Sequence, residues 1–190
     1  MDTTTAIQVI HQRSSVRTYT PEVIDPEVIR TLLAAATRAP TAMHAEPWAF
    51  VVVQDIAALH RYSELAKQGW RGQEFASALL RPDFNIFYGA STLIVICARN
   101  SGPFAEADCW LAAENLMLAA TALGLGTCCI GSAIDAINTP AIREALHIEQ
   151  GMTVVAPIIV GRAAEPCPPT SRRPAEVLAW VLPQDEGGAS

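Results

Sequence analysis

Charged residues are scarce in this sequence. Asp, Glu, Lys and Arg make up only 17% of the 190 residues, whereas hydrophobic residues make up 51%, so the chain is more apolar than a typical soluble domain. An uninterrupted apolar run of about 20 residues is nevertheless missing, which excludes a conventional membrane-spanning helix. We therefore expect the surplus apolar surface to be buried in a subunit interface.

An excess of basic charge is also missing. The formal net charge is -6 and the isoelectric point is about 5.2, which argues against a general binder of nucleic acid or of anionic membranes. The sequence contains no internal repeat and no linker between two apolar regions. Residues 1–190 are therefore predicted to form one domain, with loose segments only at the first residues, at 166–174 and at 185–190.

The cysteine pattern does not predict a metal site. The five cysteines form no C-x-x-C pair and no Cys/His cluster with metal-ligand spacing. Cys128 and Cys129 are adjacent, and their apolar neighbours favour buried structural cysteines over a redox dithiol. Because residues 1–5 lack the basic start and apolar core of a secretory signal, we expect a cytoplasmic protein with reduced thiols and no bound metal.

Hydrophobic periodicity predicts several helices of ordinary length. The first begins at a Thr5 cap, turns its apolar residues inward and ends near Arg13. The second begins with an Asp25 cap and stops before Pro40. Three more helices are expected: 56–68, 72–80, and 140–146 after an Asn138–Thr139 cap.

The most informative element is a helix predicted over 104–123, because it is apolar around almost its whole circumference. Such a helix cannot face water, and it should end at Gly124 in a left-handed conformation. Three apolar runs, 48–53, 93–98 and 153–160, predict strands that are covered on both faces. Together these elements predict an α+β sandwich with a long buried central helix that is shared between the core and a partner.

Arginines and hydroxyl groups are concentrated after the first helix. Residues 13–19 read R-S-S-V-R-T-Y. Guanidinium groups offer fork-shaped donors that match phosphate oxygens, and serines add short neutral donors. The segment is therefore a candidate phosphate site, while solvated arginines at a helix C-terminus would give the same pattern.

Four motifs in order resemble the nitroreductase family. The R-x-S-x-R pattern is followed by A-P-T-A-M-H-A-E-P-W-A-F over 39–50, where the family has A-P-S-x-x-N-x-Q-P-W-x-F. Residues 122–131, A-L-G-L-G-T-C-C-I-G, are similar to the family turn G-L-G-T-x-x-x-G. P-I-I-V-G at 157–161 and R-R-P at 172–174 follow. The resemblance covers nearly the whole chain and implies a mostly antiparallel sheet covered by helices, in an intertwined homodimer that binds flavin mononucleotide (FMN).

The resemblance also implies roles for the basic residues. Arg13, Ser14 and Ser15 would hold the FMN phosphate and ribityl chain, and the Arg172 and Arg173 pair would approach the phosphate from the C-terminal side. Arg17 would lie near the N1 and O2 edge of the flavin as the catalytic residue, where its positive charge favours the reduced cofactor.

The flavin ring would be bordered by two further groups of residues. The backbone of the turn at Cys129, Ile130 and Gly131 would face N5 and O4, with glycine allowing a close approach. The other side of the ring would be lined from the other subunit by Pro40, Thr41, Ala42 and His44. The cofactor site would then depend on dimerisation.

Several positions depart from the family pattern. Ser14 replaces a common basic residue, His44 stands where Asn is usual, and Glu46 stands where Gln is usual. A flavin-contacting Asn in the middle of the family sequence has two candidate equivalents here, Asp83 and Asn85. The remaining histidines are isolated and have no acidic partner that would indicate a triad.

The resemblance implies ping-pong hydride transfer from NADH or NADPH through FMN to a flat acceptor, such as a nitroaromatic, a quinone or a conjugated carbonyl. Three alternatives stay open. One is a flavoenzyme of the same family with oxygen-dependent oxidation or small-aldehyde reduction. The others are a flavin-binding sensor or storage protein without turnover, and an interaction domain without cofactor.

Overall fold

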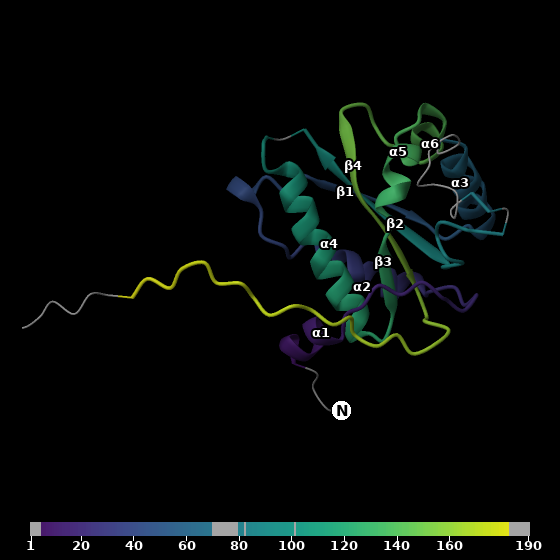
Figure 1. Ribbon diagram of the computed structural model, residues 1–190. Coiled ribbons are helices and arrows are strands. Elements are labelled where there is room, and N and C mark those ends of the chain that lie inside the picture. Colours follow the sequence, from purple (N-terminus) through teal and green to yellow (C-terminus); the bar gives the residue numbers. More distant parts are fainter. Residues whose placement is uncertain (1–4, 70–79, 82, 101, 183–190) are drawn as a thin grey trace, which may run out of the picture.

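The computed structural model describes residues 5–69, 80–81, 83–100 and 102–182 of the chain. Within these residues the centre is a four-stranded antiparallel sheet with the order β1-β2-β4-β3. The strands are β1 (Trp48–Val53), β2 (Thr92–Arg99), β3 (Gly126–Cys129) and β4 (Met152–Gly161). Helices pack on both faces of this sheet (Figure 1). The predicted α+β sandwich with a helix-covered antiparallel sheet is therefore confirmed.

Strand β2 has an apolar side chain at almost every position because both of its faces are covered. Leu93, Val95 and Cys97 belong to the apolar cluster on one face of the sheet. Ile94, Ile96 and Ala98 belong to the cluster on the opposite face. Successive side chains of a strand point to opposite faces, so an uninterrupted apolar run is the pattern that a central strand needs.

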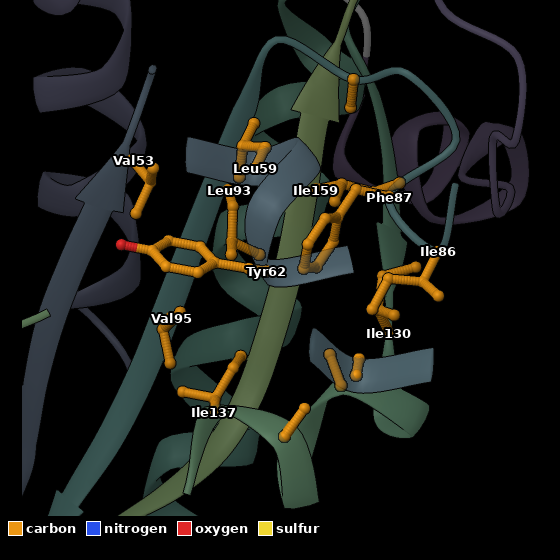
Figure 2. Close-up of a cluster of buried hydrophobic side chains, with 14 of the residues drawn as sticks. Val53, Leu59, Tyr62, Ile86, Phe87, Leu93, Val95, Ile130, Ile137 and Ile159 are labelled. Atoms are coloured by element: carbon orange, nitrogen blue, oxygen red, sulfur yellow. The ribbon is translucent and has the colours of Figure 1, made fainter. Parts of the chain in front are cut away.

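The first cluster lies between the sheet and three helices: α3 (Ile56–Gly69), α5 (Ile134–Ile137) and α6 (Pro140–Ala145). Leu59 and Tyr62 of α3 face Leu93 of β2 and Ile159 of β4 (Figure 2). A short 3-10 turn, η3 (Gly131–Ala133), joins β3 to α5. Helix α3 follows the prediction for 56–68.

The opposite cluster is covered by α2 (Pro26–Ala36) and α4 (Ala105–Ala122). The carboxylate of Asp25 accepts a hydrogen bond from the N–H of Glu27 at 2.8 Å, so α2 begins with the predicted cap. The helix ends at Ala36, before Pro40. Asn115 of α4 donates to the carbonyl of Ala35 at 3.3 Å, which ties the two helices together.

Helix α4 is apolar around almost its whole circumference, but only one side of it is buried within the chain. Ala112, Ala113 and Leu116 are fully buried, whereas Trp110 is 44% and Leu111 is 46% exposed. The predicted burial against the core is therefore found on one side of this helix, and the predicted contact of the other side with a partner stays a prediction. The helix does end at Gly124, whose φ of 72° gives the predicted left-handed cap.

Helix α1 (Ala6–Gln12) also leaves apolar surface exposed. Thr5 and Gln8 form a capping box at its start, as the Thr5 cap predicted. Val9 is buried, but Ile7 is 62% and Ile10 is 51% exposed. The expectation that all apolar residues of this helix turn inward is therefore wrong within one chain.

Three further predictions need comment. Residues 126–129 form strand β3, where only a turn was predicted, because pairing with β4 draws them into the sheet. The helix predicted over 72–80 falls almost entirely outside the described residues. Helix α6 begins at Pro140, but the Thr139 hydroxyl donates to the carbonyl of Ala136 at 2.7 Å instead of capping it.

Candidate functional site

The arginine and serine segment after α1 is held against the end of the sheet. The N–H of Arg13 still bonds to Val9 of α1 at 2.9 Å. Ser15 then forms a parallel bridge with Thr127 of β3, and the N–H of Val16 donates to the carbonyl of Thr127 at 2.9 Å. These bonds fix the backbone from which Arg13 and Arg17 project.

The far end of the segment is held by the chain that leaves β4. Tyr19 forms an antiparallel bridge with Ala163. The N–H of Thr20 donates to Arg162 at 2.9 Å, and the N–H of Ala164 donates to Thr18 at 3.0 Å. Residues 13–20 thus lie between β3 and the exit from β4, although the sequence separates these parts widely.

Two glycines permit this close approach. A Cβ atom placed on Gly126 would lie 2.7 to 2.9 Å from three side-chain atoms of Val16. A Cβ atom on Gly161 would lie 2.7 Å from the ring of Tyr19. Contacts this short do not occur between real side chains, so glycine is required at both positions by packing.

The guanidinium groups of the segment act on the buried thiol of Cys128. Burial raises the pKa of Cys128, and the positive charges of Arg17 and Arg13 partly offset this rise. Burial also raises the pKa of Cys129 to about 11. Both thiols therefore remain protonated near neutral pH, which agrees with the prediction of structural cysteines and does not support a redox dithiol.

Arg17 shares a small cavity with the predicted turn at 129–131. The cavity has a volume of about 100 Å³. Its other lining residues are Phe84, Ile86, Tyr88, Cys128 and Ser132. The sequence did not predict Phe84, Ile86, Tyr88 or Ser132, because they come from two loops that meet only when β2, β3 and β4 form the sheet.

One backbone amide of the turn is already hydrogen-bonded to the sheet. The N–H of Ile130 donates to the carbonyl of Pro157 at 2.8 Å, so this amide is not available to a ligand. Gly131 is exposed, and a Cβ atom added to it would meet nothing within 4 Å. Of the predicted backbone contacts to N5 and O4, the one from Gly131 is therefore best supported.

The predicted ring-lining residues Pro40, Thr41, Ala42 and His44 lie elsewhere in the same chain. The short 3-10 helix η1 (Ala42–His44) is bound to the start of α4, where Asp108 accepts a hydrogen bond from the N–H of Ala42 at 3.1 Å. Ser14 instead lines a cavity together with Thr121, near the end of α4.

A helix rises 1.5 Å per residue, so Asp108 and Thr121 are separated by about 20 Å along the axis. Residues 13–17 and residues 40–44 of one chain therefore do not meet. Loop 40–46 is also unusual in its backbone, because Met43, His44 and Glu46 have φ angles of 54°, 55° and 43°. Met43 at its tip is 97% exposed.

Arg172 and Arg173 belong to an extended segment that leaves the body of the protein after β4 (Figure 1). The segment starts at the candidate site, where the hydroxyl of Ser14 donates to the carbonyl of Cys167 at 3.2 Å. Both arginines are exposed, and Arg172 bonds only to the adjacent Ser171 among the contacts of the described residues. Large apolar residues continue the exposed segment: Val177, Leu178, Trp180, Val181 and Leu182.

The two candidates for a flavin-contacting residue in mid-chain behave differently. Asp83 is exposed and pairs with Arg81, whose hydrogen bond lowers the pKa of the carboxyl group. Asn85 is half-buried, and its side-chain oxygen accepts a hydrogen bond from the N–H of Phe87 at 2.8 Å. Asn85 lies beside Phe84 and Ile86 of the cavity lining, so its position is closer to the candidate site.

The described part of the chain has neither a membrane-spanning helix nor a metal-ligand cluster. None of its helices is long and apolar enough to cross a membrane. None of its His, Cys, Asp or Glu side chains gather into a group that could hold a metal ion.

Comparison with known proteins identifies the family. The model of the nitroreductase family matches residues 10–162. A protein of Archaeoglobus fulgidus named "Putative NADH dehydrogenase/NAD(P)H nitroreductase" is 32% identical over 160 residues, which cover 82% of this chain and 83% of the relative. This chain therefore belongs to the nitroreductase family, as the four motifs predicted.

Solved structures agree with this assignment. An FMN-dependent nitroreductase from Clostridium difficile R20291 has a TM-score of 0.82 and 26% identity, covering 92% of this chain and 98% of that one. A nitroreductase with bound FMN from Bacteroides fragilis shares the fold at a TM-score of 0.83, with 24% identity over 95% of this chain and 100% of that one. The predicted nitroreductase-like fold is confirmed.

Proposed function

We propose that this protein is an FMN-dependent oxidoreductase that transfers a hydride from NADH or NADPH to a flat electrophilic acceptor by a ping-pong sequence. Family membership supports the cofactor and the reaction class. The single observation in the structure that supports the site is the meeting of Arg17 with the 129–131 turn around one cavity. We further propose that residues 1–190 act as one domain in the cytoplasm, where the five free cysteines stay reduced.

The donor groups fit the charged and polar parts of FMN. Arg13 and Arg17 project from a backbone that β3 holds in place, and a guanidinium group suits a phosphate or an electron-rich ring edge. Open space above Gly131 allows a ring to approach the backbone. The bound flavin would supply the chemistry, accepting two electrons and a proton from the nicotinamide as hydride and passing them to the acceptor.

Among the described residues, the cavity beside Arg17 is too small for the whole cofactor. The cavity beside Arg17 holds about 100 Å³, whereas pockets for ligands of this size usually hold roughly 300–1,000 Å³. The missing wall is supplied, in our proposal, by loop 40–44 of a second copy. Exposed apolar residues near this loop, among them Trp110 and Leu111 of α4, would be buried in the same interface.

Each group of residues then has a distinct task. Arg13, Ser14 and Ser15 bind the phosphate and ribityl end, with Arg172 and Arg173 approaching from the extended segment that begins beside Ser14. Arg17 places a fixed positive charge at the edge of the ring, and Cys129, Ile130 and Gly131 border its other edge. In the partner, Pro40, Thr41, Ala42 and His44 cover the ring and leave one face open for the nicotinamide and then the acceptor.

Anaerobic reduction tests the reaction. The FMN-loaded protein is expected to be yellow. After anaerobic mixing with NADH or NADPH, its flavin absorbance near 450 nm should fall rapidly. Admission of a quinone or a nitroaromatic should then restore the colour, because the acceptor removes the electrons. A protein that stays yellow with both donors would be a sensor or storage protein, and a protein that stays colourless with FMN would not be a flavoprotein at all.

Subunit complementation tests the shared site. We expect Arg13→Ala and Ala42→Trp each to bind FMN poorly, the first by loss of charge and the second by a bulky ring in the proposed wall. When the two variants are unfolded together and refolded, half of the dimers are mixed and each mixed dimer has one intact site, so about a quarter of the wild-type flavin content should return. Each variant refolded alone is the control. If the mixture stays as empty as the controls, the site does not combine residues from two chains.

A further inference from the structure

Two buried polar side chains on α3 hold the segment that lines the cavity together with Arg17. Ser63 and Lys67 lie one helical turn apart and therefore on the same face of the helix. Ser63 is fully buried and Lys67 is 5% exposed. The neighbours on this face, Leu59 and Ala66, belong to the apolar cluster, so a serine and a lysine are unexpected there.

The hydrogen bonds of both residues end on one stretch of backbone. The hydroxyl of Ser63 accepts from the N–H of Ile86 at 3.1 Å. The ammonium of Lys67 donates to the carbonyl of Phe84 at 2.9 Å and to that of Arg81 at 3.4 Å, and Glu64 balances its charge. Burying an ammonium group is costly unless it is paired in this way.

The held stretch carries the aromatic wall of the cavity. Phe84 and Tyr88 both line it, and their rings meet edge to face with centroids 5.6 Å apart. Tyr88 has a φ of 53°, a conformation that non-glycine residues adopt only where the surroundings enforce it. Ile86, which lies between Phe84 and Tyr88 in the sequence, packs beside Ile130 of the turn (Figure 2). Phe87, by contrast, points into the core, where it is 1% exposed.

We infer that Ser63 and Lys67 are positioning residues, which set the Phe84–Tyr88 wall so that a flat aromatic acceptor can pack against this wall while it stacks on the open face of the flavin. This inference rests on the proposed function and adds the residues that determine acceptor specificity. Neither side chain touches the acceptor. Each acts through the backbone of 84–86, which it fixes from the core side.

The principal test is Lys67→Met, which keeps the length and helix propensity of the side chain and removes its donors. We expect KM for a quinone acceptor to rise about threefold to tenfold, the range that the loss of one aromatic contact produces. The Kd of a non-reducible arene such as benzoate, measured from the oxidised flavin spectrum, should rise equally. Turnover with ferricyanide, which accepts one electron per ion without stacking, should not change. FMN retention should not change either.

Ser63→Ala is the milder second variant. Gln68→Ala, at an exposed position of the same helix, is the matched control.

Two further measurements separate positioning from plain stabilisation. Amide hydrogen exchange over 84–88 should accelerate in Lys67→Met and Ser63→Ala but not in Gln68→Ala. Phe84→Leu should raise the quinone KM in the wild type and add little in the Lys67→Met background, because the wall is already displaced. Lower melting temperatures with unchanged quinone KM, benzoate Kd and exchange would overturn the inference. Failure of the wild type to react with NADH or NADPH would instead overturn the proposed function. The exchange data would still test whether Ser63 and Lys67 hold the backbone of residues 84–86.

Discussion

Gly126→Ala is expected to destabilise the protein and to release FMN together. The added methyl group would lie 2.7 to 2.9 Å from atoms of Val16, so the segment that carries Arg13 and Arg17 must move away from β3. Overpacking of this kind costs about 1–3 kcal/mol. For a chain of this size each kcal/mol lowers Tm by about 2–4 °C. Thermal unfolding and the flavin content of the purified protein measure the two effects.

Controls separate this clash from a general effect of alanine. Gly131→Ala meets nothing within 4 Å and has no positive φ, so its melting temperature should match that of the wild type. Val16→Ala removes two of the three clashing atoms, and in the Gly126→Ala background it should recover part of the lost stability. A Gly126→Ala protein with wild-type Tm and full flavin content would show that the segment is not held as described.

Arg13→Ala and Arg17→Ala are expected to fail in different ways. Arg13 follows α1 directly and is proposed to bind the phosphate, so its loss should remove a charge-assisted hydrogen bond worth about 1.5–3 kcal/mol and weaken FMN binding roughly tenfold to a hundredfold. Arg17 lines the cavity with the 129–131 turn. Its loss should slow flavin reduction by NADH or NADPH more than it weakens FMN binding.

Equilibrium dialysis of FMN and anaerobic stopped-flow reduction, expressed per bound flavin, distinguish the two outcomes. Arg30→Ala is the control, because Arg30 is an exposed arginine of α2 that pairs with Glu27 on the same helix. It should leave both measurements unchanged. Equal losses of binding and of reduction rate in Arg13→Ala and Arg17→Ala would refute the division of roles between them.

Several exposed features of the chain fit the proposed dimer. Loop 40–46 projects from the start of α4 with three left-handed residues, and the segment after β4 extends away with large apolar side chains exposed. A sequence with few charges leaves such surfaces apolar. In a homodimer both features would be covered, and the flavin would bind only where the two chains meet.

Local patterns in the sequence were sufficient for most of the secondary structure. Thr5 and Asp25 cap their helices as predicted, Gly124 ends α4, and the apolar runs at β1, β2 and β4 became strands. Capping, left-handed glycine and apolar runs depend on neighbouring residues alone, so a linear sequence contains them. The family motifs likewise predicted that Arg17 and the 129–131 turn belong to one flavin site; the two line one cavity, and their contacts with flavin stay a prediction.

Tertiary structure alone decided which of these residues meet. Strand β3 exists because residues 126–129 pair with β4, and Gly126 and Gly161 let residues 13–20 pack against the end of this sheet. Both contacts join segments far apart in the chain. Phe84 and Tyr88 line one cavity with Arg17, and Lys67 and Ser63 bond to the backbone of Phe84 and Ile86 from a distant helix. Loop 40–44 contacts the start of α4 at Asp108, about 20 Å along the helix axis from Thr121, which lines a cavity with Ser14. Long-range contacts of this kind depend on the packing of whole elements, and no local periodicity in the sequence encodes them.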